Sequence, residues 1–268
     1  MATANVVLER VEHPTGELAE EAVKIFSALM TEDPAAIALT GGDISLLPDL
    51  GNAIIRPAVL CQGVGQMFTA RDQTGALVGF TLFSLPGQLV PSTPQQQTCL
   101  SHFLAKLSPA GQEYYAETIG HEVPKLEDES LGITEAERNT YWCNFAMVRA
   151  DYQSKGIAKA LFALAFQEAD KLGATVGLMT TNIRNVSIYE KIGFTVCGHR
   201  IMPSPWVDWP VWLFARKPEA AENGEREAIN CELILPCPTS GFDEWRENVS
   251  RSRLRSEGPQ NRLRPHTP

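Results

Sequence analysis

One stretch of this chain constrains its fold more than any other, because an apolar segment there runs through a short polar turn into a helical pattern. The segment 141–148 is rich in aromatic and β-branched residues, which predicts a strand. The segment 156–172 carries an apolar stripe through Ile157, Leu161 and Ala165, which predicts an amphipathic helix. The turn between them therefore lies at a helix N-terminus.

The turn residues Gln153, Ser154, Lys155 and Gly156 sit where backbone N–H groups have no intrahelical partner and where the helix dipole is positive. A pyrophosphate fits such a position. Gly156 has no Cβ, so phosphates can approach the backbone closely. Lys155 can add a charge, and the small Ala158 keeps the first helical turn uncrowded. The stretch lacks both G-x-G-x-x-G and G-K-[ST], so a plain packing turn is the alternative interpretation.

The remaining segments alternate between strand and helix patterns. We expect further strands at 6–11, 66–70, 77–83, 175–181, 194–202 and 209–215 and helices at 18–29, 50–60 and 185–192, with short helical pieces and loops over 31–48. This order predicts a mixed α/β (α+β) domain with helices on both faces of one sheet.

A helical insertion at about 86–138 interrupts the strand rhythm, with helical stretches near 103–107 and 112–119. From Glu113 to Glu137 it holds eight acidic residues and one Lys, which we interpret as a solvated helical face. We place the domain at 1–216. Residues 217–268 are polar and rich in Pro and Gly, so we expect a disordered tail in which Leu233–Leu235 could dock as a short strand.

Charge and cysteine usage exclude several kinds of protein. The net charge of −9 argues against a general nucleic-acid binder, which needs a basic surface to neutralise phosphates. The six cysteines form no C-x-x-C pair, which favours free thiols in a reducing compartment and no zinc or other metal site. The sequence shows no signal pattern and no apolar run of membrane-spanning length, so we predict a cytoplasmic protein without a membrane partner. Nothing in the sequence indicates an oligomeric state.

Two motifs, taken together, resemble the GNAT superfamily of N-acetyltransferases. Gln153-Ser-Lys-Gly-Ile-Ala158 is similar to its acyl-CoA pyrophosphate motif, Gln/Arg-x-x-Gly-x-Gly/Ala. Asn185-Val-Ser-Ile-Tyr189-Glu-Lys-Ile-Gly193-Phe194 is similar to its second signature, Asn-x-x-x-x-Tyr-x-x-x-Gly-Phe, with one residue fewer in the first gap. About one helix and one strand separate the motifs, as in the family. The resemblance is close over 140–200 and extends to 1–85 only in the order of elements.

The resemblance implies a GNAT-like mixed, mostly antiparallel central sheet and acetyl-CoA as cosubstrate. It implies that the strand segment 145–148 pairs with the pantetheine arm, that the turn holds the pyrophosphate, and that two asparagines bond the pantetheine amides. The implied cofactor contacts are Ala146, Met147, Val148, Gln153, Ser154, Lys155, Gly156, Ile157, Ala158, Asn182 and Asn185. Asn182 could equally cap the following helix.

Tyr189 is the implied acid that protonates the departing CoA thiolate, and the alternative is a half-buried aromatic that only packs. Many GNAT enzymes carry a basic Glu near the start of the strand that lies here at 141–148, and this chain has Tyr141, Trp142, Cys143 and Asn144 instead. We expect Cys143 to be a buried structural cysteine and not an acetylated nucleophile. His102, His121 and Glu122 are the weakest candidates for a base.

For the amine acceptor, the resemblance implies a site built by the segments 31–43, 141–144 and 203–209. Trp142, Trp206 and Asp208 are the candidate contacts, because aromatic rings and a carboxylate can hold a cationic amine. The alternative is that Trp206 and Trp209 cover the edge of the core.

The sequence thus predicts an N-acetyltransferase that moves an acetyl group from acetyl-CoA to a primary amine of a small molecule or peptide. The alternative is a non-catalytic acyl-CoA-binding GNAT-like module. A third possibility, an unrelated α/β binding domain, is disfavoured by the paired motifs.

Overall fold

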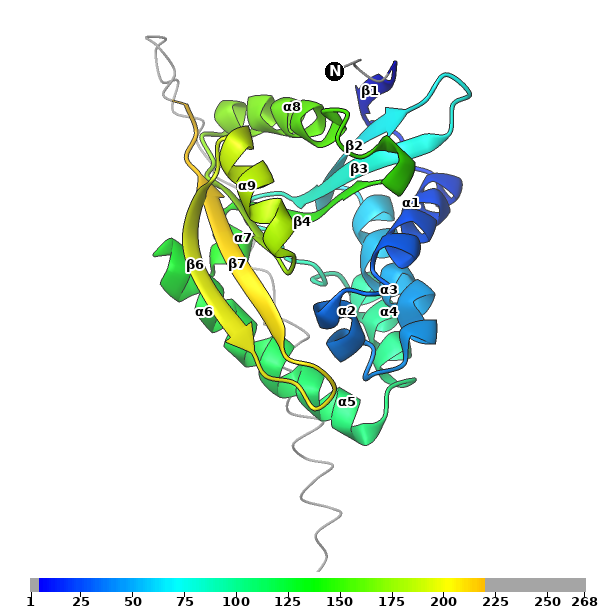
Figure 1. Cartoon of the computed structure of the whole chain (residues 1–268), viewed down its shortest axis with the longest axis vertical. Helices are drawn as coiled ribbons and strands as arrows, with labels where there is room; N and C mark the ends of the chain where they lie inside the picture. Colours follow the sequence, from blue (N-terminus) through cyan, green and yellow to red (C-terminus); the bar gives the residue numbers. More distant parts are fainter. Residues whose placement is uncertain (1–4, 220–268) are drawn as a thin grey trace, which may run out of the picture. The chain divides into compact units, whose positions relative to one another are not determined.

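The computed structural model describes residues 5–219, which fold around one seven-stranded sheet (Figure 1). The strands lie in the order β1-β2-β3-β4-β5-β7-β6, and only the pair β4–β5 is parallel. Their bounds are β1 Val7–Arg10, β2 Gly65–Arg71, β3 Leu77–Ser84, β4 Tyr141–Val148, β5 Val176–Thr180, β6 Thr195–Met202 and β7 Trp209–Arg216. The predicted mixed, mostly antiparallel sheet is confirmed.

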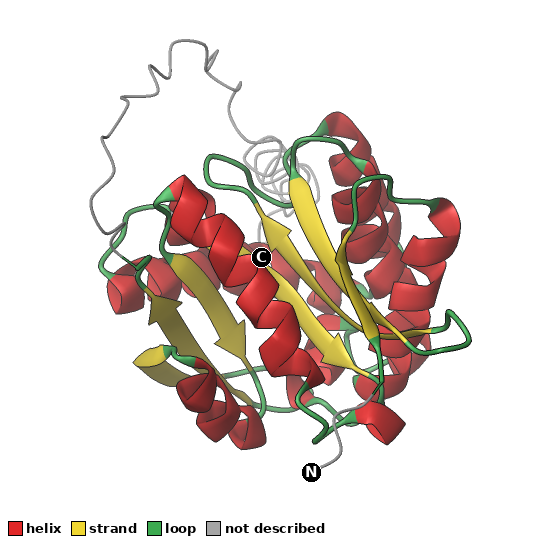
Figure 2. Cartoon of the chain, turned by 90° about the horizontal axis from the view of Figure 1, so that it is seen from above, coloured by secondary structure: helices red, strands yellow, loops and turns green. Residues whose placement is uncertain are grey.

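Helices cover both faces of the sheet, as expected (Figure 2). On one face, α8 (Ile157–Leu172) and α9 (Ile183–Ile192) bury a core cluster in which Phe83, Phe162 and Phe214 are fully inaccessible. On the other face, α1 (Gly16–Leu29) meets β4, where Phe26 packs edge-on against Phe145 at 5.6 Å between ring centroids. Apolar side chains on alternate positions of each strand thus fill two separate layers.

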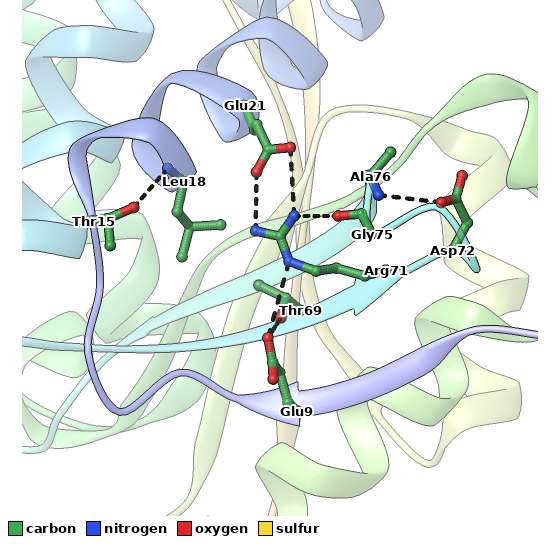
Figure 3. Close-up of polar contacts among 9 residues, drawn as sticks. All are labelled: Glu9, Thr15, Leu18, Glu21, Thr69, Arg71, Asp72, Gly75 and Ala76. Atoms are coloured by element: carbon green, nitrogen blue, oxygen red, sulfur yellow. Dashed lines mark hydrogen bonds and ion pairs between the residues drawn. The ribbon is translucent and has the colours of Figure 1, made fainter.

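The first half of the chain continues with α2 (Pro34–Leu39), the 3₁₀ turn η1 (Ile44–Leu46) and α3 (Leu47–Leu60). An arginine on β2 ties this half together (Figure 3). Arg71 donates to the Glu21 carboxylate of α1 at 2.9 Å and to the Gly75 carbonyl at 2.7 Å, and its guanidinium lies 4.0 Å from Glu9 of β1. One guanidinium therefore joins β1, α1 and the β2–β3 hairpin turn.

The insertion forms α4 (Pro94–Leu104), α5 (Pro109–Tyr114), the π-helix η2 (Tyr115–Glu122), α6 (Val123–Leu131) and α7 (Ala136–Asn139). The π-helix ends two residues before Pro124, whose ring would clash with the carbonyl four residues back in a regular α-helix. Residues of α2, α5 and α6 pack on β7 in a second cluster that includes Trp142 and Trp209. The insertion therefore completes the core on the face opposite α8.

The predicted elements are present, with shifts of a few residues at their ends. The helical stretch expected near 103–107 overlaps only the last two residues of α4 (Pro94–Leu104), and α8 begins at Ile157, because Gly156 is its N-cap. The solvated interpretation of the acidic run is wrong for Glu127, which is 3% exposed. The predicted tail beyond Glu219, including Leu233–Leu235, lies outside the described residues.

Candidate functional site

The two parallel strands of the sheet separate after three residue pairs. Strand β4 pairs with β5 only over Tyr141–Cys143, against Val176–Leu178, and then continues to Val148 beside β3 alone. Leu82 pairs with Phe145 and Phe83 pairs with Cys143, so Asn144 is the extra residue of a β-bulge. A bulge bends and twists its strand, so it explains why β4 leaves β5 here. The predicted pantetheine segment 145–148 has a strand partner on one side only.

The open edge of β4 leads through the 3₁₀ turn η3 (Ala150–Tyr152) to the N-terminus of α8. Ser154 and Gly156 both have positive φ, 60° and 81°, which folds the turn back on itself. Within the described part of the chain, the backbone N–H groups of residues 154–158 donate to no other residue. The Gln153 side chain instead donates to the Val148 carbonyl at 3.0 Å and closes the loop. The turn thus presents free amides at a helix N-terminus, where an anion binds best.

A tyrosine that the sequence analysis did not single out anchors this loop. The Tyr152 hydroxyl donates to Asp72 of the β2–β3 turn at 3.1 Å. Hydrogen bonds from Thr74 and the nearby Tyr152 hold the pKa of the Asp72 carboxyl below its usual range. The Lys155 ammonium lies 4.5 Å from the centre of the Tyr152 ring and donates to the Asp151 carbonyl at 2.8 Å, so its charge stays beside the loop.

Tyr189 lies in the core cluster beneath α8 and is 8% exposed. Its ring packs edge-on against Phe162 and Phe194, each at 5.8 Å between centroids. Burial, with a smaller contribution from the neighbouring Cys143, raises the pKa of the Tyr189 phenol. No described residue forms a hydrogen bond with the Tyr189 hydroxyl. The phenol is therefore held as a neutral donor beside the first residues of the β4 bulge.

Cys143 faces the same cluster and is 6% exposed. Its thiol donates to the Phe145 carbonyl across the bulge at 3.4 Å, and burial raises its pKa. A thiol held neutral is a poor nucleophile, so the geometry agrees with a structural cysteine.

The two asparagines predicted to contact pantetheine lie at the end of β5. The Asn182 side chain accepts from the Arg184 N–H at 3.0 Å and caps α9, which is the alternative role considered for it. The Asn185 amide donates to the Thr180 hydroxyl at 3.1 Å. Both amides therefore have local partners at the end of the strand that flanks the gap.

The predicted acceptor residues fall into two groups. Trp206 lies over the backbone of Gly41 and Gly42, where a Cβ on Gly42 would come within 2.5 Å of the Trp206 ring. The exposed Asp208 accepts from the Ser204 N–H at 3.0 Å and shapes the β6–β7 loop. Trp142 is 2% exposed and packs inside the second cluster, against which Trp206 also packs. The structure thus joins the segments 31–43 and 203–209 and leaves Trp142 in the core.

Two polar pairs on this side had no sequence signal, because their members are far apart along the chain. The Trp209 indole N–H donates to the Tyr114 hydroxyl of the insertion at 2.6 Å. The Thr181 hydroxyl donates to Asp33, the N-cap of α2, at 2.6 Å. Both pairs fix loops around the end of β5.

The three remaining candidates belong to the insertion, His102 on α4 and the other two on η2. His102 and His121 are exposed, and the Glu122 carboxylate lies 3.8 Å from the Arg200 guanidinium of β6. Among residues 5–219, no group of three or more His, Cys, Asp or Glu side chains is arranged to hold a metal ion. Over the same range, no helix combines the length and the apolar character that crossing a bilayer requires.

Comparison with known proteins agrees with this geometry. Residues 90–203 match the model of a family described as an acetyltransferase (GNAT) domain. A solved structure from Corynebacterium glutamicum, described as histone acetyltransferase HPA2 and related acetyltransferase, aligns with a TM-score of 0.53 at 16% identity over 81% of this chain and 98% of that one. Arylalkylamine N-acetyltransferase 2 from Aedes aegypti aligns with a TM-score of 0.53 at 12% identity over 80% of this chain and 99% of that one. At these identities the structural matches show the fold, and the family match covers both motifs. Residues 90–203 thus match the GNAT acetyltransferase domain, and the described part of the chain shares the fold of these two acetyltransferases.

Proposed function

We propose that this protein transfers an acetyl group from acetyl-CoA to a primary amine of a small molecule or peptide. The observation that carries the proposal is the continuity of two features. The unpaired edge of β4 from Asn144 to Val148 leads through η3 to the free amides of residues 154–158. The edge offers main-chain groups to the amides of a pantetheine arm, and the turn offers N–H donors to a pyrophosphate.

The chemistry of these residues suits the parts of acetyl-CoA. The phosphates would lie over the turn, with Gln153, Ser154, Lys155, Gly156, Ile157 and Ala158 as its contacts. The pantetheine would run along Ala146, Met147 and Val148 toward the bulge, with Asn182 and Asn185 on the opposite strand end. The thioester would then lie near Cys143 and Asn144, beside Tyr189.

The transfer itself needs few protein groups. The lone pair of a neutral amine attacks the acetyl carbonyl carbon, a C–N bond forms, and the C–S bond breaks with its electron pair leaving on sulfur. The proton that the amine nitrogen loses goes to water. Tyr189 donates a hydrogen bond or a proton to the expelled thiolate, and water reprotonates the phenol. Burial raises the pKa of the phenol, so the hydroxyl keeps its proton at neutral pH and can donate to the sulfur.

The acceptor site would lie on the face that carries the β6–β7 loop, with Trp206 and Asp208 near the entrance. One structural neighbour is named for arylalkylamines, so arylalkylamines belong in the first panel of acceptors, together with polyamines, amino-acid amides and short peptides with a free N-terminus.

The test has two stages. Calorimetry should show acetyl-CoA binding that Gly156→Val weakens, and CoA release should then show transfer to at least one amine of the panel. Absence of acetyl-CoA binding would contradict the proposal. Binding without transfer to any amine would favour the second candidate, a non-catalytic acyl-CoA-binding module. The position of Tyr189 beside the bulge counts against that second candidate.

A further inference from the structure

The bulge residue Asn144 has an amide whose orientation is fixed. Its Nδ2 donates to the Ser84 hydroxyl at 3.1 Å and to the Trp142 carbonyl at 3.3 Å. A main-chain carbonyl can only accept, so the nitrogen and not the oxygen must face Trp142. Both amide protons are therefore used. No described residue donates to the remaining oxygen, Oδ1.

Asn144 lies on the face of the sheet opposite Tyr189. Phe83 and Cys143 are paired and belong to the cluster beneath α8 that contains Tyr189. Ser84 and Trp142 are the next pair, and Trp142 belongs to the cluster on the other face. Because successive strand residues point to opposite faces, Ser84 holds the Asn144 amide on that other face. Asn144 and Tyr189 thus flank the departure of β4 from β5 from opposite sides.

We propose that Asn144 positions the acceptor: its Oδ1 accepts a hydrogen bond from the N–H of a neutral primary amine while the amine lone pair attacks the thioester carbon. This inference rests on the proposed function, because it assigns a role within that transfer. A side-chain amide accepts hydrogen bonds but takes no proton at neutral pH. The amine therefore loses its proton to water before it enters.

The titratable groups around Asn144 agree with this role. Cys143 and Tyr189 on the α8 side are buried, and burial raises the pKa of both. On the other side, the Asp33 carboxylate accepts from the Ala35 and Ala36 N–H groups and from Thr181, so three donors occupy it. The buried residues of α1 and α3 on this face carry no titratable side chain: all are apolar residues, glycine or proline. None of these groups is arranged to take a proton from the amine.

The experiment compares two small primary amines, propylamine and glycinamide, whose ammonium pKa values differ strongly. Enzyme-dependent CoA release is followed against pH at high amine concentration. We expect kcat/KM for each amine to rise with pH up to that amine's own pKa. Asn144→Ala should lower kcat/KM for both amines by about ten-fold, since one hydrogen bond is lost. Its Kd for acetyl-CoA should equal that of the parent protein, which also shows that the variant is folded.

Ser84→Ala is the matched variant, because it removes one anchor of the amide and leaves Oδ1 in place. Its effect on kcat/KM should be clearly smaller than that of Asn144→Ala. An apparent pKa that is the same for both amines would overturn the proposal, because it would reveal a base on the protein. Unchanged turnover in Asn144→Ala would also overturn it, as would no transfer to either amine while acetyl-CoA binds normally. Failure to bind acetyl-CoA is a separate result and would overturn the proposed function itself.

Discussion

The Thr181 hydroxyl donates a hydrogen bond of 2.6 Å to the Asp33 carboxylate, and this contact joins the end of β5 to the start of α2. Asp33 also caps α2 through the N–H groups of Ala35 and Ala36. One carboxylate thus fixes the strand that flanks the gap to the segment that we expect to line the acceptor site.

Thr181→Val should remove this contact while it keeps the shape of the side chain. Hydrogen bonds to charged groups are worth more than neutral ones, so we expect a loss of about 1.5 kcal/mol in the free energy of unfolding. Urea unfolding measures it. Thr98→Val is the control, because the exposed Thr98 hydroxyl bonds only to the Pro94 carbonyl of its own helix. Equal losses in the two variants would show that the link between β5 and α2 adds no stability.

Gly156 and Gly173 offer a second matched pair, at the two ends of α8. Both have positive φ, 81° and 61°, and a Cβ on either would meet no protein atom within 4 Å. Valine at either position should therefore cost a similar amount through backbone strain, at least about 1–2 kcal/mol. Only Gly156→Val should also lower the affinity for acetyl-CoA, by ten-fold or more, because only its side chain would occupy the predicted phosphate position. Calorimetry decides this, and equal affinity in both variants would place the phosphates elsewhere.

Two carboxylates of the insertion should make stability depend on pH. Burial raises the pKa of Glu137 to about 7 from an ordinary value of 4.5. Burial and the nearby Glu137 raise the pKa of Glu127 well above the same value. Between about pH 4.5 and about pH 7, these two carboxyl groups bind more protons in the folded state than in the unfolded state. The free energy of unfolding should therefore fall as pH rises from about 4.5 to about 7 and beyond.

Glu127→Gln should reduce this fall, because the neutral amide replaces the protonated acid. The melting temperature of each protein, measured at intervals of about one pH unit from roughly pH 5 to pH 9, gives the slope of its stability against pH. Glu129→Gln is the control on the same helix, since the exposed Glu129 carboxylate lies 3.6 Å from Arg200 and carries only a surface ion pair. A slope that Glu127→Gln leaves unchanged would contradict the burial argument.

The features that the sequence predicted well are local ones. The strand β4, the turn and the helix α8 follow one another within about thirty residues, and each has its own signal: β-branched and aromatic residues, Gly156 at the N-cap and an apolar stripe. The alternating elements on either side could be placed for the same reason. Shifts arose at helix ends, where the cap geometry and not the apolar period decides the boundary.

The features that the sequence did not predict join distant residues. Tyr152 and Asp72 are 80 positions apart, and Tyr114 and Trp209 are 95 apart. Nothing in either local pattern specifies such a partner. Glu127 was expected in solvent because its neighbours are acidic, yet α6 packs that position inward beside α7. Asn144 could be recognised as the place where a carboxylate is missing, but the bulge and the face that it occupies required the strand register.

The last prediction concerns the phenol of Tyr189, whose hydroxyl has no hydrogen-bond partner among the described residues although the ring is 8% exposed. Tyr189→Phe keeps the ring contacts with Phe162 and Phe194 and removes only this donor. A thiolate expelled into an apolar gap needs such a donor, so kcat should fall by about 10²-fold while the Kd of acetyl-CoA stays constant.

Because burial raises the pKa of the phenol, it stays protonated, and Tyr189 should cause no alkaline loss of activity up to its ordinary pKa of about 10. Tyr115→Phe is the control, since the Tyr115 hydroxyl is buried without a partner and lies in the insertion; its kcat should equal that of the parent protein. Turnover of Tyr189→Phe at the parental rate would leave Tyr189 a packing residue, and a joint loss of kcat and acetyl-CoA affinity would make the phenol a cofactor contact.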